Sequence, residues 1–305
     1  MKKRNILEIT DVSQKELKHL IKRAHFFSHY PRKSFRKLKG AHVGLLFDAN
    51  SLRTKMSFEV AIYKMGGVPY FIPLQSVTHE DGATRESSED IIDTLDRFVD
   101  LYIVRDYSQK MLTVLKLKND PPLFNGFSGV GHPSQALADL SVITHKKGDP
   151  SRLRICAVCP ADGSGVIESF AYAILMLGGK ITLITPTGKF TGKNEDFQSQ
   201  INTLPGTLTV TKNISAVMEA DVLYVDEWWK NTPDFLEKAK PPKKYRVDET
   251  FLIGTKKELI ILHCLPAHHD REISEEVITS ARSIVFDEAE FRLYSAMAWL
   301  EFMAK

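Results

Sequence analysis

The sequence of 305 residues has few cysteines and no long apolar run. Three cysteines, Cys156, Cys159 and Cys264, are too few for a disulfide framework. No second Cys or His pair stands at metal-ligand spacing from Cys156 and Cys159, which disfavours a metal site. No stretch reaches the roughly 18 apolar residues of a membrane span, and no apolar segment of signal-peptide type follows the basic first residues. We therefore expect a cytoplasmic protein with reduced thiols and no membrane partner.

The sequence also lacks an excess of charge of either sign. Its 41 basic and 38 acidic residues give a formal net charge of +3. A dedicated nucleic-acid binder usually has a stronger basic excess, so we expect no nucleic-acid partner. The basic run 32–40 is typical of a solvated loop. A mildly positive balance is compatible with small anionic substrates.

Short apolar runs alternate with amphipathic stretches along the chain, a pattern typical of parallel α/β sheets. Strands are expected at 42–47, 68–72, 101–104, 122–125, 154–159, 180–184, 207–211, 222–225, 259–262 and 283–286. Helices are expected at 13–28, 88–98, 133–145, 165–177, 214–219, 274–280 and from 288 onward. A further helix is expected to start after residue 51 and to end at Gly66-Gly67. The polar breaker 146–150 is a plausible domain boundary. Two α/β domains on either side of it would leave an interdomain cleft, a common place for a ligand.

The first candidate site is the segment Ser51-Leu52-Arg53-Thr54, between an expected buried strand and an expected helix. Free backbone N–H groups and the positive end of the helix dipole favour an anion at such a position. Two hydroxyls and a guanidinium suit a phosphate in particular. An ordinary N-cap serine beside a surface arginine is the alternative, and the segment lacks the G-x-x-x-x-G-K of a Walker loop.

Two further segments follow expected strands. His132 and Gln135 flank Pro133, which suits a first helical turn, after the glycine-rich loop 126–131. A neutral histidine there can donate a hydrogen bond to a carbonyl group, or it can simply cap the helix. The segment 263–266, His-Cys-Leu-Pro, follows the apolar run 259–262. Ligands of open α/β sheets bind at the carboxyl ends of strands, although an ordinary turn would also fit.

Together, four segments resemble the aspartate and ornithine carbamoyltransferase family. Residues 51–59, Ser-Leu-Arg-Thr-Lys-Met-Ser-Phe-Glu, resemble its Ser-Thr-Arg-Thr-Arg-x-Ser-Phe-Glu motif. Residues 132–139 are similar to its His-Pro-x-Gln-x-Leu-x-Asp motif, and residues 286–293 to its Glu-Ala-Glu-Asn-Arg ending. Residues 263–266 resemble the His-Cys-Leu-Pro of the ornithine branch, where the aspartate branch has Pro-Leu-Pro. Four matches in family order make the resemblance specific.

The resemblance implies a fold, an activity and an assembly. Residues 1–146 would bind carbamoyl phosphate, residues 151–287 would bind the acceptor amino acid, and a C-terminal helix, 288–305, would cross back to the first domain. The implied reaction transfers the carbamoyl group of carbamoyl phosphate to ornithine, giving citrulline and phosphate in arginine metabolism. The implied assembly is a homotrimer or a multiple of trimers with shared active sites. No metal or organic cofactor is implied.

Positions that match the family's motifs imply the following roles. The phosphate would be held by Ser51, the backbone of Leu52, Arg53 and Thr54. The carbamoyl oxygen would be polarised by Arg105, His132 and Thr54, and the carbamoyl nitrogen bound by Gln135. The carbamoyl phosphate site would be completed by Cys264, Leu265 and Arg292, with Cys264 also in the catalytic set. The acceptor would be bound by Asp226, Lys230, Gly165 and Cys264. A cis peptide bond is expected between Leu265 and Pro266.

The acceptor side departs from the ornithine branch. Asp226 is retained, but the Ser-Met-Gly that should follow is absent, and Lys230 places a cation where the amine of ornithine would approach. Gly165 stands where the branch has an asparagine. In the loop that would reach a neighbouring subunit, Glu89 matches but the usual Gln or Lys upstream is missing, with Arg85 as a possible substitute.

Three interpretations follow from these departures. The chain is an ornithine carbamoyltransferase with a divergent acceptor loop, a carbamoyltransferase for another amine or amino acid, or a non-catalytic relative or assembly partner that binds carbamoyl phosphate. The His-Cys-Leu-Pro segment favours the first, the missing Ser-Met-Gly favours the second, and the retained arginines and His132 oppose the third. A dinucleotide dehydrogenase is disfavoured because no G-x-G-x-x-G follows the first strand of either expected domain.

Overall fold

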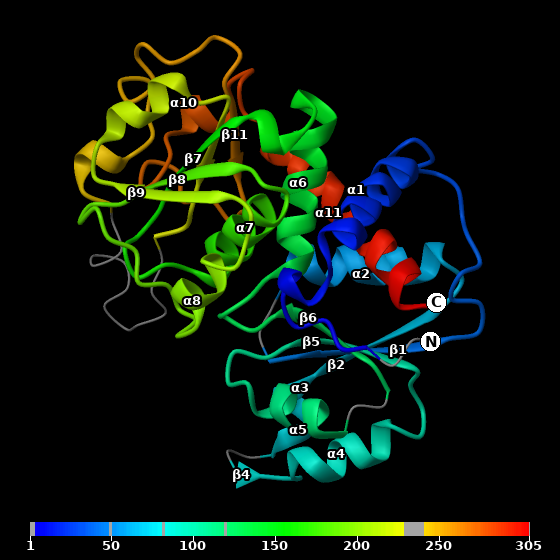
Figure 1. The fold of residues 1–305 in the computed structure, drawn as a ribbon. Coiled ribbons are helices and arrows are strands. Elements are labelled where there is room, and N and C mark those ends of the chain that lie inside the picture. Colours follow the sequence, from blue (N-terminus) through cyan, green and yellow to red (C-terminus); the bar gives the residue numbers. More distant parts are fainter. Residues whose placement is uncertain (1–3, 49–50, 81–82, 119–120, 229–240, 305) are drawn as a thin grey trace. The chain divides into compact units, whose positions relative to one another are not determined.

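The computed structural model describes residues 4–48, 51–80, 83–118, 121–228 and 241–304 (Figure 1). The chain divides into two compact units. The first unit comprises residues 1–141 and 290–305, and the second unit comprises residues 142–289. Each unit is built on its own parallel sheet with helices, so the expected two-domain α/β fold class is confirmed.

The first unit contains a four-stranded sheet in the order β2-β1-β5-β6. Its strands are β1 (His42–Phe47), β2 (Val68–Pro73), β5 (Leu101–Arg105) and β6 (Leu123–Phe127), with the antiparallel pair β3 (His79–Glu80) and β4 (Ala83–Thr84) outside the sheet. Its helices are α1 (Gln14–Ser28), α2 (Leu52–Lys64), α3 (Leu74–Thr78), α4 (Ser88–Leu95), α5 (Lys110–Lys118) and the 3-10 turn η1 (Ile9–Asp11). The inner strands are almost wholly buried, as is typical of parallel sheets covered on both faces.

The second unit contains a five-stranded sheet in the order β11-β10-β7-β8-β9. Its strands are β7 (Arg154–Val158), β8 (Lys180–Ile184), β9 (Thr207–Thr211), β10 (Val222–Val225) and β11 (Ile260–His263). Its helices are α7 (Gly165–Met176), α8 (Phe197–Ile201), α10 (Glu275–Ile278) and the 3-10 turns η2 (Pro150–Arg152), η3 (Ile214–Glu219) and η4 (Lys243–Tyr245). Every residue of α7 is buried, which explains its unusually apolar sequence.

Two long helices, α6 and α11, each have residues in both units. The helix α6 (Pro133–Lys147) begins in the first unit, and α11 (Val285–Met303) begins in the second. The part of α11 after residue 290 belongs to the first unit. It contributes Arg292 and the buried Trp299, whose ring lies 5.2 Å from that of Phe124 on β6.

The prediction of a strand at 283–286 is wrong. The chain touches β11 there through one parallel bridge, Ile261 to Ser283, with Ile284 N–H donating to the carbonyl of Ile261. The helix α11 then begins at Val285, three residues before the expected start at 288. Asp287 and Glu288 in its first turn favour the positive end of the helix dipole, which explains why the apolar run does not continue as a strand.

The structure bears on two predictions from the sequence, the reduced thiols and the lack of a membrane-spanning segment. Cys156, Cys159 and Cys264 are buried and form no disulfide within the described residues, and burial raises the pKa of the Cys156 thiol to about 11. Within the described ranges, no helix is long and apolar enough to cross a membrane.

Candidate active site

The parallel sheet of the first unit brings three candidate segments to one edge. The strands β1, β5 and β6 are hydrogen-bonded neighbours, and their carboxyl ends lead to Ser51–Thr54, to Arg105 and to the loop before His132. Because parallel strands end at the same edge, these polar groups gather there although they are far apart in sequence. The sheet order therefore explains how three separate motifs can form one site.

The helix α2 offers its N-terminus at this edge. Ser51 is the N-cap residue of α2, and no side-chain capping hydrogen bond from it is found in the described part of the chain. Thr54 in the first turn is buried, whereas the side chain of Leu52 is 73% exposed. Leu52 therefore contributes only its backbone here, which fits its position in place of a hydroxyl residue.

Arg292 on α11 connects this helix start to α6. Its guanidinium donates hydrogen bonds to Thr54 Oγ1 (3.0 Å), to Ser134 Oγ (3.3 Å) and to Gln135 Oε1. Gln135 Nε2 donates in turn to Asp139 Oδ1 at 2.7 Å. Because Arg292 and these partners are buried, the network fixes the rotamers of Thr54 and Gln135 before any ligand binds.

Arg105 and His132 both lie against one aromatic ring, that of Phe127. The guanidinium of Arg105 lies 4.9 Å from the centroid of the Phe127 ring, and it donates a hydrogen bond to the hydroxyl of Tyr107. The Phe127 ring stacks on the imidazole of His132, with centroids 4.7 Å apart and planes at 22°. Phe127 therefore fixes the spacing of the two groups that the family resemblance assigns to the carbamoyl oxygen.

The electrostatics of this edge are strongly positive. Burial, followed by the charges of Arg292, Arg105 and Arg53, holds the pKa of His132 well below its ordinary value. His132 is therefore neutral and can donate one ring hydrogen. Three guanidinium groups within range of one neutral histidine form a site suited to a small dianion.

The candidate acceptor residues lie in the second unit, after neighbouring strands. Asp226 follows β10 and is buried, and Ser164 Oγ donates a hydrogen bond to its Oδ2 at 2.9 Å. Ser164 also caps α7, whose first residue is Gly165. In the described ranges, Asp226 Oδ1 has no hydrogen-bond partner. Gly165 therefore lies beside the hydroxyl that orients Asp226, but it offers no side chain.

The charge on Asp226 is set by its surroundings. Burial raises its pKa to about 7, with the nearby carboxylates of Glu272 and Glu168 acting in the same direction and the Ser164 hydrogen bond opposing them. Glu168 is also buried. Burial raises its pKa to about 7, although two backbone N–H groups donate hydrogen bonds to its carboxylate. A carboxyl group whose pKa lies near 7 is only partly ionised at neutral pH, and a nearby cation would favour its carboxylate form.

The His-Cys-Leu-Pro segment begins at His263, the last residue of β11, which is the neighbour of β10. Cys264 is buried, Leu265 has a positive φ of 53°, and the peptide bond between Leu265 and Pro266 is cis, as expected. Lys230, the remaining predicted acceptor residue, lies outside the described residues.

Several residues of the site could not be found from motifs. Phe127 carries no polar group, and Asn125 lies inside an apolar strand. Asn125 Nδ2 donates to the carbonyl of Gly131 at 3.1 Å and so shapes the loop that ends at His132. The only sequence signal for either residue is its position, Asn125 just before the glycine-rich loop 126–131 and Phe127 within it.

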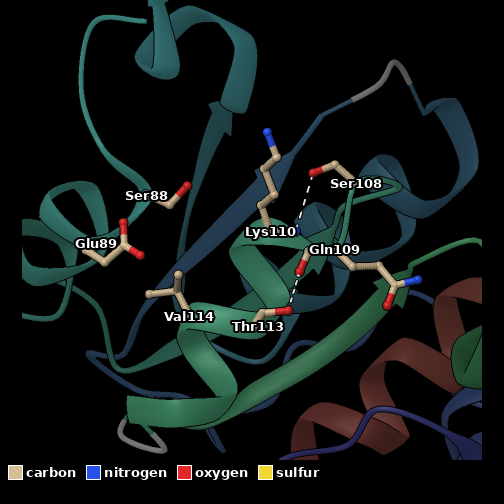
Figure 2. A pocket seen from close by; sticks show the side chains of 7 residues that line it. All are labelled: Ser88, Glu89, Ser108, Gln109, Lys110, Thr113 and Val114. Carbon is tan, nitrogen blue, oxygen red and sulfur yellow. Dashed lines mark hydrogen bonds between the residues drawn. The ribbon is translucent and has the colours of Figure 1, made fainter.

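A separate hollow of about 430 Å³ lies between α4 and α5 (Figure 2). Its lining residues are Ser88, Glu89, Ser108, Gln109, Lys110, Thr113 and Val114. Its lining does not include Arg105, His132 or Arg292, so this hollow is distinct from the candidate site.

Known proteins match the chain over almost its whole length. The family model for the carbamoyl-P binding domain of aspartate/ornithine carbamoyltransferase matches residues 4–145, and the model for the Asp/Orn binding domain matches residues 152–303. An ornithine carbamoyltransferase of Methanococcus aeolicus is 32% identical, with 98% of this chain and 99% of the relative covered.

Solved structures match as well. The ornithine carbamoyltransferase of Thermus thermophilus superimposes with a TM-score of 0.85 at 30% identity, covering 100% of both chains. An N-acetyl-L-ornithine transcarbamylase superimposes with a TM-score of 0.83 at 26% identity, covering 98% of this chain and 99% of the other.

Proposed function

Because the chain belongs to the aspartate/ornithine carbamoyltransferase family, we propose that it transfers the carbamoyl group of carbamoyl phosphate to the side-chain amine of ornithine, giving citrulline and phosphate. The observation that carries the proposal is the buried, neutral His132 surrounded by Arg53, Arg105 and Arg292. Such a site fits a doubly charged acyl phosphate whose carbonyl group needs a neutral hydrogen-bond donor. Residues 1–141 and 290–305 would bind carbamoyl phosphate, and residues 142–289 the acceptor.

The phosphate would lie at the N-terminus of α2. There Ser51, Arg53, Thr54 and the first backbone N–H groups can all donate to it, including the N–H of Leu52. Thr54 accepts a hydrogen bond from Arg292, so its own hydroxyl hydrogen remains available for a ligand. This arrangement leaves the carbamoyl carbon beyond the phosphate and toward Arg105 and His132.

The reaction proceeds by attack of the neutral amine on the carbamoyl carbon. The developing charge on the carbamoyl oxygen would be stabilised by Arg105, His132 and Thr54, which are already fixed by Phe127 and Arg292. Gln135 would hold the carbamoyl nitrogen through its side-chain oxygen. Cys264 and Leu265 would complete the site. The leaving phosphate can take the proton that the amine loses, so much of the remaining catalysis is positioning.

Asp226 would bind the amino group of the acceptor. Its Oδ1, which has no hydrogen-bond partner among the described residues, can accept a hydrogen bond, and a cation nearby would lower its raised pKa and favour the carboxylate. Cys264 would contact the acceptor from β11, with Gly165 and Lys230 near the rest of it.

A second candidate is a carbamoyltransferase for a modified or different amine. Gly165 cannot supply the side-chain amide that the ornithine branch has at this position, and the Ser-Met-Gly is absent from the sequence. A structural neighbour that acts on N-acetyl-L-ornithine is consistent with a change of acceptor within this fold.

A colorimetric assay for ureido products separates the two candidates. We expect turnover of carbamoyl phosphate with ornithine to exceed turnover with acetylornithine, putrescine, lysine and aspartate by at least tenfold. Higher turnover with another amine would establish the second candidate. Absence of turnover with all five amines, alongside binding of carbamoyl phosphate, would contradict the first candidate and leave an acceptor outside the panel or a non-catalytic relative.

We further propose a homotrimer with shared active sites. Leu52, Met56 and Tyr63 are exposed on α2, and Val68 and Tyr70 are exposed on the edge strand β2. A row of exposed apolar side chains beside a sheet edge favours burial against another copy of the chain. Sedimentation should give a mass of about three times 34.5 kDa, and Tyr63→Asp should reduce it to that of one chain. A monomeric parent protein would contradict the proposal.

The location proposed for the protein is the cytoplasm, where citrulline would feed arginine metabolism. Its three buried cysteines, which form no disulfide within the described residues, fit a reducing compartment. Cell fractionation that recovers the protein mainly outside the cytoplasm would contradict this location.

A further inference from the structure

The turn after β11 contains an unfavourable backbone conformation in a residue other than glycine. Leu265 has φ at 53°, in the left-handed region that side chains with a Cβ rarely adopt. Such a conformation persists only where surrounding contacts determine it. The contacts that do so here involve His263 and Glu272, which the proposed mechanism does not use.

The backbone of Leu265 is held by the imidazole of His263. The N–H of Leu265 donates to His263 Nδ1 at 2.9 Å. Because Nδ1 accepts this hydrogen bond, the ring hydrogen of a neutral His263 must be on Nε2. Nε2 lies 3.2 Å from Glu272 Oε1, so the same imidazole donates to a carboxylate on its other side. The tautomer of His263 is therefore fixed by its two partners.

Glu272 fixes the other end of the turn as well. The same Oε1 accepts a hydrogen bond from the backbone N–H of His268 at 2.6 Å. Burial opposes the charge on Glu272, but the hydrogen bonds from His263 and His268 hold its pKa below the ordinary value, so the group is a carboxylate. The side chains of His263 and Glu272 are 0% and 2% exposed. One buried carboxylate thus holds the turn at Leu265, through His263, and directly at His268.

A second carboxylate anchors the start of the turn. The backbone N–H of His263 donates to Glu288 Oε2 at 2.9 Å. Glu288 is buried in the first turn of α11, a rigid element. The backbone on both sides of Cys264 is therefore anchored, at His263 directly by Glu288 and at Leu265 by the imidazole that Glu272 holds. Cys264 itself can move little relative to β11.

We propose that His263, oriented by Glu272, is a positioning residue for carbamoyl transfer, which fixes the backbone of Cys264 and Leu265 against the reacting groups. This inference rests on the proposed function, in which Cys264 and Leu265 line the site. His263 acts through Leu265 and does not touch a substrate. Displacement of a reacting partner by about 1 Å can slow a reaction by about 100-fold, so this role predicts a loss in kcat.

Two substitutions of His263 separate positioning from bulk packing. His263→Phe keeps a ring of similar shape but removes both hydrogen bonds. His263→Asn loses ring volume, yet its side-chain oxygen can accept from the N–H two residues later, as in an Asx turn. We expect His263→Phe to lower kcat by about 30- to 100-fold and His263→Asn to recover at least tenfold of that loss. Poor packing alone would give the opposite order, because Asn leaves the larger void.

Inorganic phosphate provides the control for the rest of the protein. Its candidate site is made by Ser51, Arg53 and Thr54 of the first unit, so its dissociation constant, measured by calorimetry, should stay within about twofold in both variants. Glu272→Gln should lower kcat with the same unchanged phosphate affinity. Glu275→Gln, on the exposed side of α10, is the matched control for loss of one carboxylate and should keep the parent kcat.

The inference is overturned if folded His263→Phe keeps the parent kcat, or if His263→Asn is no faster than His263→Phe. If His263→Phe does not fold, Glu272→Gln with parent kcat overturns it equally. Failure of the proposed function is a different result, because the unsubstituted protein would then carry out no carbamoyl transfer at all.

Discussion

Arg105→Ala is expected to lower kcat for carbamoyl transfer by about 100- to 1000-fold, the usual effect of removing one donor from an oxyanion-stabilising set. The guanidinium is held over Phe127 and Tyr107 and is directed by its hydrogen bond to the Tyr107 hydroxyl. Because the charge it opposes develops on the carbamoyl oxygen during attack, its loss should act on kcat more than on substrate affinity. Steady-state kinetics with carbamoyl phosphate and the preferred amine measure both quantities.

Two neighbouring substitutions test whether the effect belongs to the guanidinium. Arg105→Lys keeps the positive charge but loses the flat group that lies against the two rings, so we expect recovery of no more than about tenfold. Tyr107→Phe keeps the ring and removes one hydrogen bond, so we expect a loss of less than tenfold. Equal kcat values for Arg105→Ala and the parent protein would remove Arg105 from the catalytic set.

The sheets could be predicted from sequence because their strands are short, buried and flanked by polar breakers. The strands β8, β9 and β10 have the expected bounds. The helices α3 and α8, of five residues each, were not expected, because so few residues carry no helical period. The helix α5 was also not predicted. It follows Gln109, whose positive φ of 59° could not be expected of a glutamine.

The end of the second unit shows why an apolar run alone misleads. Residues 283–286 have the composition of a strand, and one bridge from Ser283 to β11 does form. The next residues start a 19-residue helix that buries Trp299 and Leu300 in the first unit. This long-range packing, added to the acidic residues of the first helical turn, outweighs local strand propensity.

The motifs named the polar groups of the site but not their contacts. Arg292 and Gln135 are separated by 157 residues, and only the fold places the guanidinium between Thr54 and Gln135. The packing of Phe127 against both Arg105 and His132 is equally hidden, since an aromatic residue in a strand is usually core. The neutral state of His132 depends on these contacts as well. Sequence therefore predicts which groups are present, while their charge states require the structure.

Arg53→Ala is expected to weaken binding of carbamoyl phosphate by about 100-fold. A charge-assisted hydrogen bond to an ion contributes about 1.5–3 kcal/mol, so loss of a two-pronged contact from one guanidinium costs about 3 kcal/mol. That energy corresponds to a change of about 100-fold in the dissociation constant. Calorimetry with carbamoyl phosphate measures it, and Arg36→Ala, in the exposed basic loop, is the matched control for loss of one positive charge.

The same substitution has a second expected effect, on His132. Burial is the largest cause of its low pKa, and the charge of Arg53 adds to it after those of Arg292 and Arg105. Removing Arg53 should therefore raise the pKa of His132 only in part, and NMR titration of the imidazole should find it still below the ordinary value. The rate would then fall at acidic pH as His132 gains a proton, because an imidazolium is no longer the neutral donor that the site requires. Unchanged affinity for carbamoyl phosphate in Arg53→Ala would place the phosphate away from the start of α2, and with it the whole assignment of roles along this sheet edge would fail.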